Sequence, residues 1–292
     1  MKQLFTLMAL LCYVTSTNAQ SDSTVLTKKE NDTIRIGNII IINRKNSDDK
    51  QSSTNISVTK QERRQPKNVS TNWFIVDFGF SNYVDRTNYS NTGNYLYNRT
   101  TPVRTAPLGT NDFNLDVTKS LNINIWFFMQ RLNLIQHHVN LKYGLGVELN
   151  NYRYNSAVSY RKENPFVTGQ APAPTVFRDS VSFSKNKLAA DYFTVPLMIN
   201  FCTNTVNQNK GVSISVGVSG GFLYNHRNKQ VSEPRGKQKV ENGLGLEQFK
   251  FSYIGEIGLG PVRLYGSYSP TSFYKKGLDM RPYTLGIRLS NW

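Results

Sequence analysis

Seven charged side chains lie within apolar segments of this 292-residue chain and form its first candidate site. Hydrophobic residues flank most of them on both sides, as in Val-Asp77-Phe and Ile-Arg288-Leu. The set is Asp77, Lys142, Glu148, Lys250, Glu256, Arg263 and Arg288. Acids and bases are nearly balanced, and buried charges are tolerated when they are paired and hydrogen-bonded. We therefore predict a structural ion-pair network. The alternative is an interior that conducts ions or relays protons.

Histidine supplies the second candidate chemistry. His226 is followed by Ser232 and Glu233, residue types that could form a nucleophilic Ser/His/acid site. His137 and His138 fall at an expected turn. Since the spacing around His226 does not distinguish such a site from an ordinary loop, we predict no enzymatic activity. The alternative is a lipid-modifying hydrolase or acyltransferase, of the lipid A deacylase or acyltransferase type. No Cys/His cluster has ligand spacing, so neither a metal nor a cofactor is expected.

The N-terminus indicates export. Lys2, an apolar run over 4–14 and small residues at 17–19 resemble a signal peptide, which we expect over residues 1–19. The run is too short to span a bilayer as a helix. Lipidation at Cys12 is the alternative, but Leu11 is a poor residue before a lipidated cysteine. Cleavage would leave Cys202 without a disulfide partner.

Residues 20–70 are polar and poor in aromatics, which predicts a largely disordered periplasmic segment. A short hairpin is expected near 33–43, where two β-branched runs flank Gly37 and Asn38. This segment is a candidate docking site for a periplasmic protein partner.

Segments of about ten residues with period-two alternation recur after residue 71, the pattern of tilted membrane strands. We expect eight, over 72–82, 120–131, 138–152, 190–202, 212–224, 248–260, 262–269 and 283–292. The first should place Trp73 inward, and the second should place Met129 outward. We also expect a bulge at Pro196 and a phase shift at Gly220 and Gly221. The mean hydropathy of -0.45 fits a barrel, because only alternate residues face lipid.

Connection lengths alternate between short and long, as in outer-membrane barrels with short periplasmic turns and long outer loops. Short connections follow the second, fourth and sixth segments. We therefore predict a fold of the all-β class: an eight-stranded antiparallel transmembrane β-barrel over 71–292, located in the outer membrane. Tyrosines near the loop bases, including Tyr95, Tyr152, Tyr154 and Tyr160, are expected in an outer interfacial girdle.

The net charge of +16 concentrates in two of the long loops. The basic residues there are Arg153, Arg161, Lys162, Arg178, Lys185, Lys187, Arg227, Lys229, Arg235, Lys237 and Lys239. Nucleic acid is an implausible target for an exported protein, whereas lipopolysaccharide presents phosphates at the outer rim. Lipopolysaccharide contacts are the prediction, and solvated loop charge is the alternative.

The segment 191–199, Asp-Tyr-Phe-Thr-Val-Pro-Leu-Met-Ile, resembles a strand of the outer-membrane β-barrel family that includes the PorT-like proteins of Gram-negative bacteria. The glycine-patterned segments 217–222 and 255–260 and the closing segment 285–289 are similar to that family as well. The resemblance covers 72–292 and implies a monomeric eight-stranded barrel. The expected role is structural or interactive at the cell envelope, with outer-membrane lipids and the barrel-assembly machinery as partners. A component of a secretion or assembly machinery is a further alternative.

Overall fold

The computed structural model describes residues 32–36, 39–43, 57–60, 67–97, 107–163, 174–204, 211–260 and 262–290. The chain divides into two units, residues 1–64 and 65–292. The signal peptide expected over 1–19 lies outside the described residues. Within them, no helix is both long and apolar enough to cross a membrane.

The first unit contains a three-stranded antiparallel sheet made of β1 (Asp32–Ile36), β2 (Ile39–Asn43) and β3 (Ser57–Lys60). β1 and β2 pair with Ile36 opposite Ile39, at the place where a hairpin is expected. β3 was not predicted; it pairs with the other edge of β2 within a segment that we expected to be disordered.

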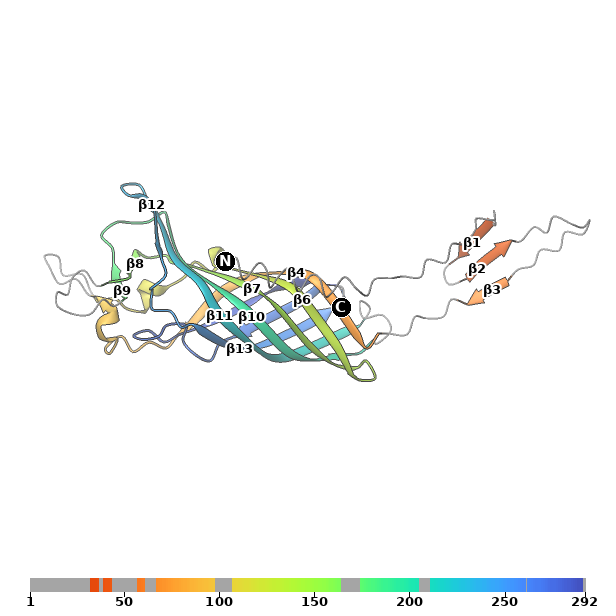
Figure 1. Ribbon diagram of the computed structural model, residues 1–292. Coiled ribbons are helices and arrows are strands. Elements are labelled where there is room, and N and C mark those ends of the chain that lie inside the picture. The colour runs from red at the N-terminus through yellow and green to blue at the C-terminus, as the bar shows by residue number, and fades with distance from the viewer. Residues whose placement is uncertain are drawn as a thin grey trace, which may run out of the picture. The chain divides into compact units, whose positions relative to one another are not determined.

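In the described part of the second unit, eight strands close into a ring (Figure 1). They are β4 (Val69–Asp85), β6 (Leu121–Ile135), β7 (Val139–Arg153), β10 (Lys185–Cys202), β11 (Val212–Ser232), β13 (Phe249–Leu259), β14 (Val262–Tyr268) and β15 (Met280–Leu289). Each pairs antiparallel with its neighbours, and β15 closes the ring against β4. The predicted fold is confirmed, although several strands run beyond their predicted ends.

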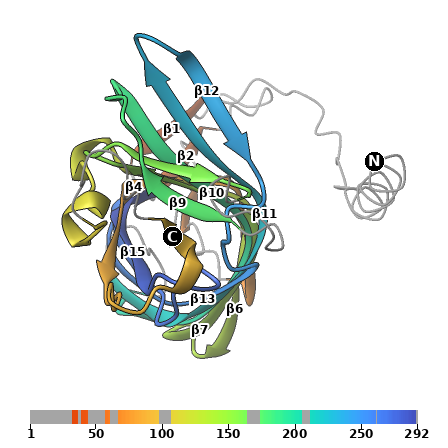
Figure 2. The same cartoon turned by 90° about the vertical axis from the view of Figure 1, so that its left-hand side faces the viewer.

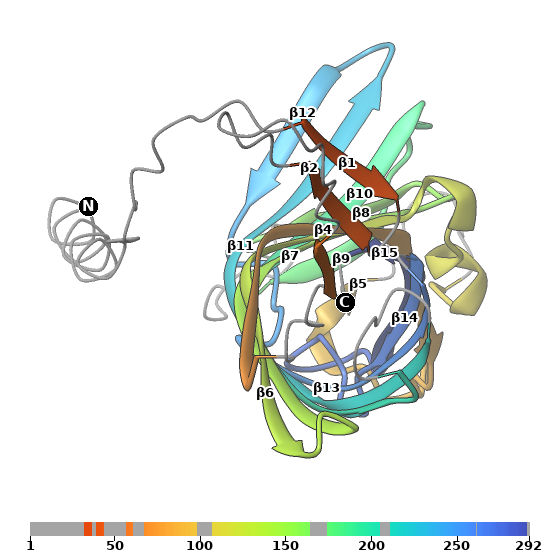
Figure 3. The same cartoon turned by 90° about the vertical axis from the view of Figure 1, so that its right-hand side faces the viewer.

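Short connections over 136–138, 203–211 and 260–261 join strands at one end of the ring, which Figure 3 faces. Longer connections lie at the other end and contain small elements of their own (Figure 2). These are η2 (Gly93–Tyr95), β5 (Leu96–Tyr97), η3 (Thr110–Phe113), η4 (Val117–Lys119), β8 (Val158–Arg161), β9 (Thr175–Arg178) and β12 (Gly236–Glu241). β12 pairs with the overhanging end of β11 and forms a hairpin beyond the ring.

Alternation along the strands separates a lipid-facing surface from a polar interior. β7 keeps this period over its whole length, with Asn140, Lys142 and Glu148 buried inside. Outward positions on β10 and β11 are apolar and exposed, including Phe193, Val195, Leu197, Val212, Ile214 and Val216. A closed ring with this pattern satisfies its backbone hydrogen bonds internally and presents an apolar belt to lipid.

Paired irregularities in β4 and β6 correct the predicted faces of the first two strands. Trp73 is 62% exposed rather than inward, and Met129 is fully buried rather than outward. Phe74 has a φ of 53°, and the register of β6 against β7 shifts between Trp126 and Phe128. Both strands therefore change phase at the same level, so their inner faces stay aligned.

Two other predicted irregularities are wrong in position. Pro196 keeps the alternation of β10 and points inward, and Gly220 and Gly221 keep the phase of β11. The register between β10 and β11 shifts instead between Asp191 and Tyr192, near the outer end of the apolar belt.

The lipid-facing role of the outer surface gives a first prediction. Val216 of β11 lies between Ile199 and Gly255 on the neighbouring strands and is half exposed. Val216→Arg should destabilise the folded barrel by about 2–4 kcal/mol, because it places a charge in the hydrocarbon region. Urea unfolding in phospholipid vesicles, followed by the shift between folded and unfolded gel bands, measures this cost. Gln238→Arg on exposed β12 is the control; equal stability of the two variants would contradict a membrane-facing surface.

Candidate functional site

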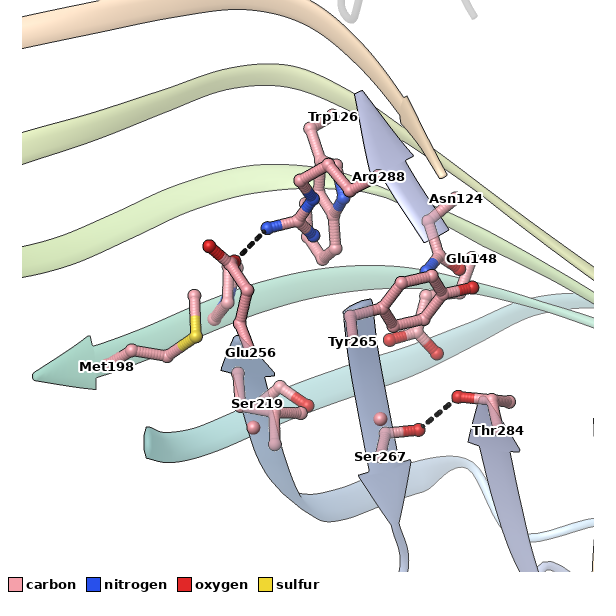
Figure 4. A pocket seen from close by; sticks show the side chains of 14 residues that line it. Asn124, Trp126, Glu148, Met198, Ser219, Glu256, Tyr265, Ser267, Thr284 and Arg288 are labelled. Carbon is pink, nitrogen blue, oxygen red and sulfur yellow. Dashed lines mark hydrogen bonds and ion pairs between the residues drawn. The ribbon is translucent and has the colours of Figure 1, made fainter. Parts of the chain in front are cut away.

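Five of the seven predicted interior charges form one network around Arg288 of β15 and Glu256 of β13. Figure 4 shows the contact between these two side chains. The Nε and Nη2 atoms of Arg288 donate to the two carboxylate oxygens of Asp77 at 2.6 and 2.7 Å, and its Nη1 donates to Glu256 at 2.7 Å. Asp77 lies directly opposite Arg288 across the β15–β4 junction. A bidentate, buried pair therefore joins the first and last barrel strands.

Glu256 is the shared acceptor of this network. Besides Arg288, it accepts from Lys142 Nζ at 2.7 Å and from Arg263 Nη1 at 3.0 Å. All four side chains are at least 95% shielded from solvent. Lys250 and Glu148 form a separate buried pair. The structure thus joins all seven predicted charges into ion pairs, in two groups.

Neutral donors complete the shell around Asp77. Trp126 Nε1 donates to Asp77 at 2.7 Å, and Asn124 donates to the same carboxylate at 3.2 Å. Arg131 is a further buried cation on β6. Trp126 was not predicted as a partner of Asp77, and Arg131 was not predicted to be an interior charge. The bulge in β6 turns Met129 and Arg131 to the inner face. Their burial could be predicted only if the position of this bulge were known.

Side chains fill most of this interior. The cavity beside Trp126, Glu256 and Arg288 has a volume of about 30 Å³, which is room for about one or two water molecules. Ser267 and Thr284 share a hydrogen bond on its wall, as Figure 4 shows. Chemically, the site is an arrangement of satisfied charges; within the described residues, no group of His, Cys, Asp and Glu could hold a metal ion.

A second core, made of aromatic side chains, closes the loop end of the ring. Tyr95, Tyr152, Tyr154 and Tyr160 are buried there, so their predicted place in an exposed interfacial girdle is wrong. The hydroxyls of Tyr154, Tyr160 and Tyr274 hydrogen-bond to one another. Burial raises the pKa of Tyr154 to about 12, so this phenol stays protonated at neutral pH. The described parts of the long loops therefore form a packed cap.

Four basic residues of the predicted outer set lie side by side on neighbouring strands. Arg153 of β7 lies opposite Lys187 of β10, Lys187 lies opposite Lys229 of β11, and Lys229 lies opposite Lys239 of β12. Lys187 also bonds Asn151 at 2.6 Å, and Arg153 bonds the Ser184 carbonyl oxygen at 2.5 Å. We call Arg153, Lys187, Lys229 and Lys239 the basic row. Lys185 and Lys237 flank it, each opposite Val231.

Other members of the predicted set serve local contacts. Arg178 Nη2 donates to both carboxylate oxygens of Asp112, at 2.6 and 2.7 Å. Arg227 forms an ion pair with Asp191 at 2.7 Å, and Arg235 forms one with Asp179 at 2.8 Å. Arg161 lies over the Phe177 ring at 5.3 Å, and Lys162 is exposed beside Gly243.

These acidic partners come from other loops, so sequence spacing could not pair them in advance. Asp112 and Arg178 are on different outer connections, as are Asp179 and Arg235. Within the basic row, Lys239 pairs with Glu241 two residues away and lowers the pKa of that carboxyl through hydrogen bonding and charge.

The candidate nucleophilic residues are not brought together. His226 and Ser232 lie six residues apart on continuous β11, roughly 20 Å along an extended strand. The His226 ring instead accepts from the Leu244 backbone N–H at 3.4 Å. Glu233 follows the strand end, beyond Ser232. His138 bonds the Cys202 carbonyl oxygen at the opposite end of the ring.

The closed ring with an apolar belt and a polar, ion-paired interior defines a transmembrane β-barrel of the outer-membrane class. Residues 61–273 match the model of the outer membrane protein beta-barrel domain, and the chain belongs to this family. The protein is therefore located in the outer membrane.

Solved structures that match include two of Ail, the attachment invasion locus protein of Yersinia pestis, one of them in complex with the heparin analogue sucrose octasulfate. Each is 11% identical, with a TM-score of 0.28, and the match covers 74% of this chain and 96% of that one. No curated protein matches the sequence.

The shared role of Glu256 gives a second prediction. Glu256→Gln keeps the shape of the side chain but leaves three buried cations without their common carboxylate. The barrel should lose about 3–5 kcal/mol of unfolding free energy. Urea unfolding in vesicles measures the loss. Glu241→Gln, which removes an exposed pair, should change stability by less than about 1 kcal/mol. A Glu256→Gln barrel as stable as the Glu241→Gln control would show that the network does not stabilise the fold.

Proposed function

We propose that this protein is a non-enzymatic interaction barrel of the cell envelope, whose basic outer face binds the phosphate groups of lipopolysaccharide. The basic row carries this proposal. Like charges directly opposite one another destabilise a sheet, so four adjacent cations are a cost to the fold itself. A multiply phosphorylated ligand would offset that cost through charge-assisted hydrogen bonds.

The position of the basic row supports this assignment. On β10, Lys187 lies six residues beyond Phe193, which is the outermost exposed aromatic of the belt on that strand. Both belong to the outward set of alternating positions, so the row faces away from the barrel axis. The interface just outside the hydrocarbon region is where lipid phosphates lie, and positive patches attract them.

Other parts of the proposal concern partners. The ion-paired interior favours a plugged, structural barrel, and the closed ring, with its first and last strands paired, favours a monomer. Kinship with the PorT-like proteins is supported by the segment 191–199 on β10. The barrel-assembly machinery is the expected partner during insertion, and residues 20–70 are the candidate contact for a periplasmic protein. Nucleic acid is not an expected partner.

Charge neutralisation tests the binding proposal. Replacing Lys187, Lys229 and Lys239 together with Gln should reduce retention of diphosphoryl lipid A by about tenfold or more, because three phosphate contacts are lost. Native mass spectrometry of the detergent-purified barrel titrated with diphosphoryl lipid A measures retention. The matched control replaces Lys119, Lys275 and Lys276, which lie on other loops, with Gln. Equal retention by the two triple variants would reject the basic row as the binding site.

The non-enzymatic part has its own test. Lipid A from a deletion strain should have the same acylation and phosphorylation pattern as lipid A from the parent, measured by mass spectrometry. This result is expected because His226 lies apart from Ser232 along β11. An altered pattern that is restored by the wild-type gene but not by a His226→Ala variant would instead establish the lipid-modifying alternative.

A further inference from the structure

An apolar hollow interrupts the lipid-facing surface on β10, β11 and β13, and two of these strands, β10 and β11, also carry the basic row. Its volume is about 780 Å³, and most of its lining surface is apolar. Outward-facing side chains supply most of the apolar lining: Phe193 and Val195 from β10, Phe222 from β11, and Phe249 and Phe251 from β13. The buried side chains of Lys250 and Tyr274, together with Glu247, also border the hollow. Elsewhere on these strands, most outward positions carry a bulky side chain that fills the corresponding space.

A single glycine leaves the hollow open. Gly220 of β11 lies between Val195 and Phe251 in the strand register. Two residues closer to the loop end of the barrel, Phe222 lies between Phe193 and Phe249. A Cβ atom at Gly220 would meet no atom within 4 Å. The backbone therefore does not require glycine for close approach here. The missing side chain leaves a notch between aromatic walls.

The notch and the basic row lie in line along two strands. On β11, Gly220 is nine residues from Lys229 with a bulge between them, and on β10, Val195 is eight residues from Lys187. These separations are roughly 25–30 Å along the strands, and less in depth because barrel strands tilt. An amphiphile that carries phosphates at one end and long acyl chains at the other could contact both features at once.

We infer that Gly220 and its aromatic neighbours form a seat for one acyl chain of a phosphorylated outer-leaflet lipid whose headgroup binds the basic row. This inference rests on the proposed function. Charge identifies the occupant, because cations lie only on the outer side of the hollow along β10 and β11, and the apolar lining selects a hydrocarbon chain. The acyl chain packs against Phe193, Phe222 and Phe251. It makes more van der Waals contacts there than it would on a lipid-facing surface without the notch.

Filling the notch tests the seat. Gly220→Leu should reduce retention of diphosphoryl lipid A about tenfold in native mass spectrometry, because its side chain occupies the space of roughly two methylene groups of the lipid. Gly255→Leu is the matched control: Gly255 is an outward glycine on neighbouring β13, and its Cβ would meet only Ser215 O, at 3.9 Å, an ordinary contact. Folding of each variant is verified by the gel shift between boiled and unboiled samples. Gly220→Ala, the smaller change, should give an intermediate loss and serves if Gly220→Leu does not fold.

The outcomes separate this inference from the proposed function. Loss of lipid A in both Gly220→Leu and the basic-row variant, with retention by Gly255→Leu, supports both. Loss in the basic-row variant alone overturns the acyl seat and leaves phosphate binding intact. Retention of lipid A by the basic-row variant overturns the proposed function. It also overturns the inference that one lipid molecule occupies both the basic row and the hollow.

Discussion

The Arg288–Asp77 pair is the contact on which closure of this barrel depends. A sheet of eight strands becomes a barrel only when its last strand pairs with its first, and here that junction holds a buried bidentate ion pair between directly opposed residues. A slip of one residue would move Arg288 to the lipid face and leave Asp77 buried without its partner. The pair therefore fixes the register of β15 on β4, because a shifted register would cost the energy of burying an unpaired charge. Glu256 extends this constraint to β13, and Lys142 extends it to β7.

The same constraint explains why the irregularities of β4 and β6, close to the ion-pair network, occur as a pair. The interior is filled by side chains, so a strand that changes phase alone would turn a lipid-facing residue into the network. At Phe74 and Phe127, β4 and β6 change phase together, which keeps Met129 and Arg131 inside and Trp73 outside. Bulges are local and tolerated when the neighbouring strand compensates.

Sequence periodicity predicted all eight barrel strands and the seven interior charges, because alternation reports which residues share a face. It failed where the phase shifts, as at Met129 and at the register shift next to Tyr192, because a bulge carries no signal in composition. It also failed for the loops. The tyrosines of the cap follow no period, and their burial depends on contacts such as Tyr154 with Tyr274, which lie 120 residues apart. Ion pairs between loops, such as Arg178 with Asp112, are invisible for the same reason.

The basic row depends on an asymmetry of the ring. β10 and β11 run past the apolar belt by several residues, and β12 adds a further strand to their overhang. Without this extension, Lys187, Lys229 and Lys239 would sit on separate loops with no fixed spacing. On the extended sheet they are held at neighbouring positions about 5 Å apart, strand to strand. Such spacing suits several phosphate oxygens of one ligand better than it suits separate counterions. The overhang thus converts a general excess of positive charge into a surface with defined geometry, on the same two strands, β10 and β11, that border the notch at Gly220.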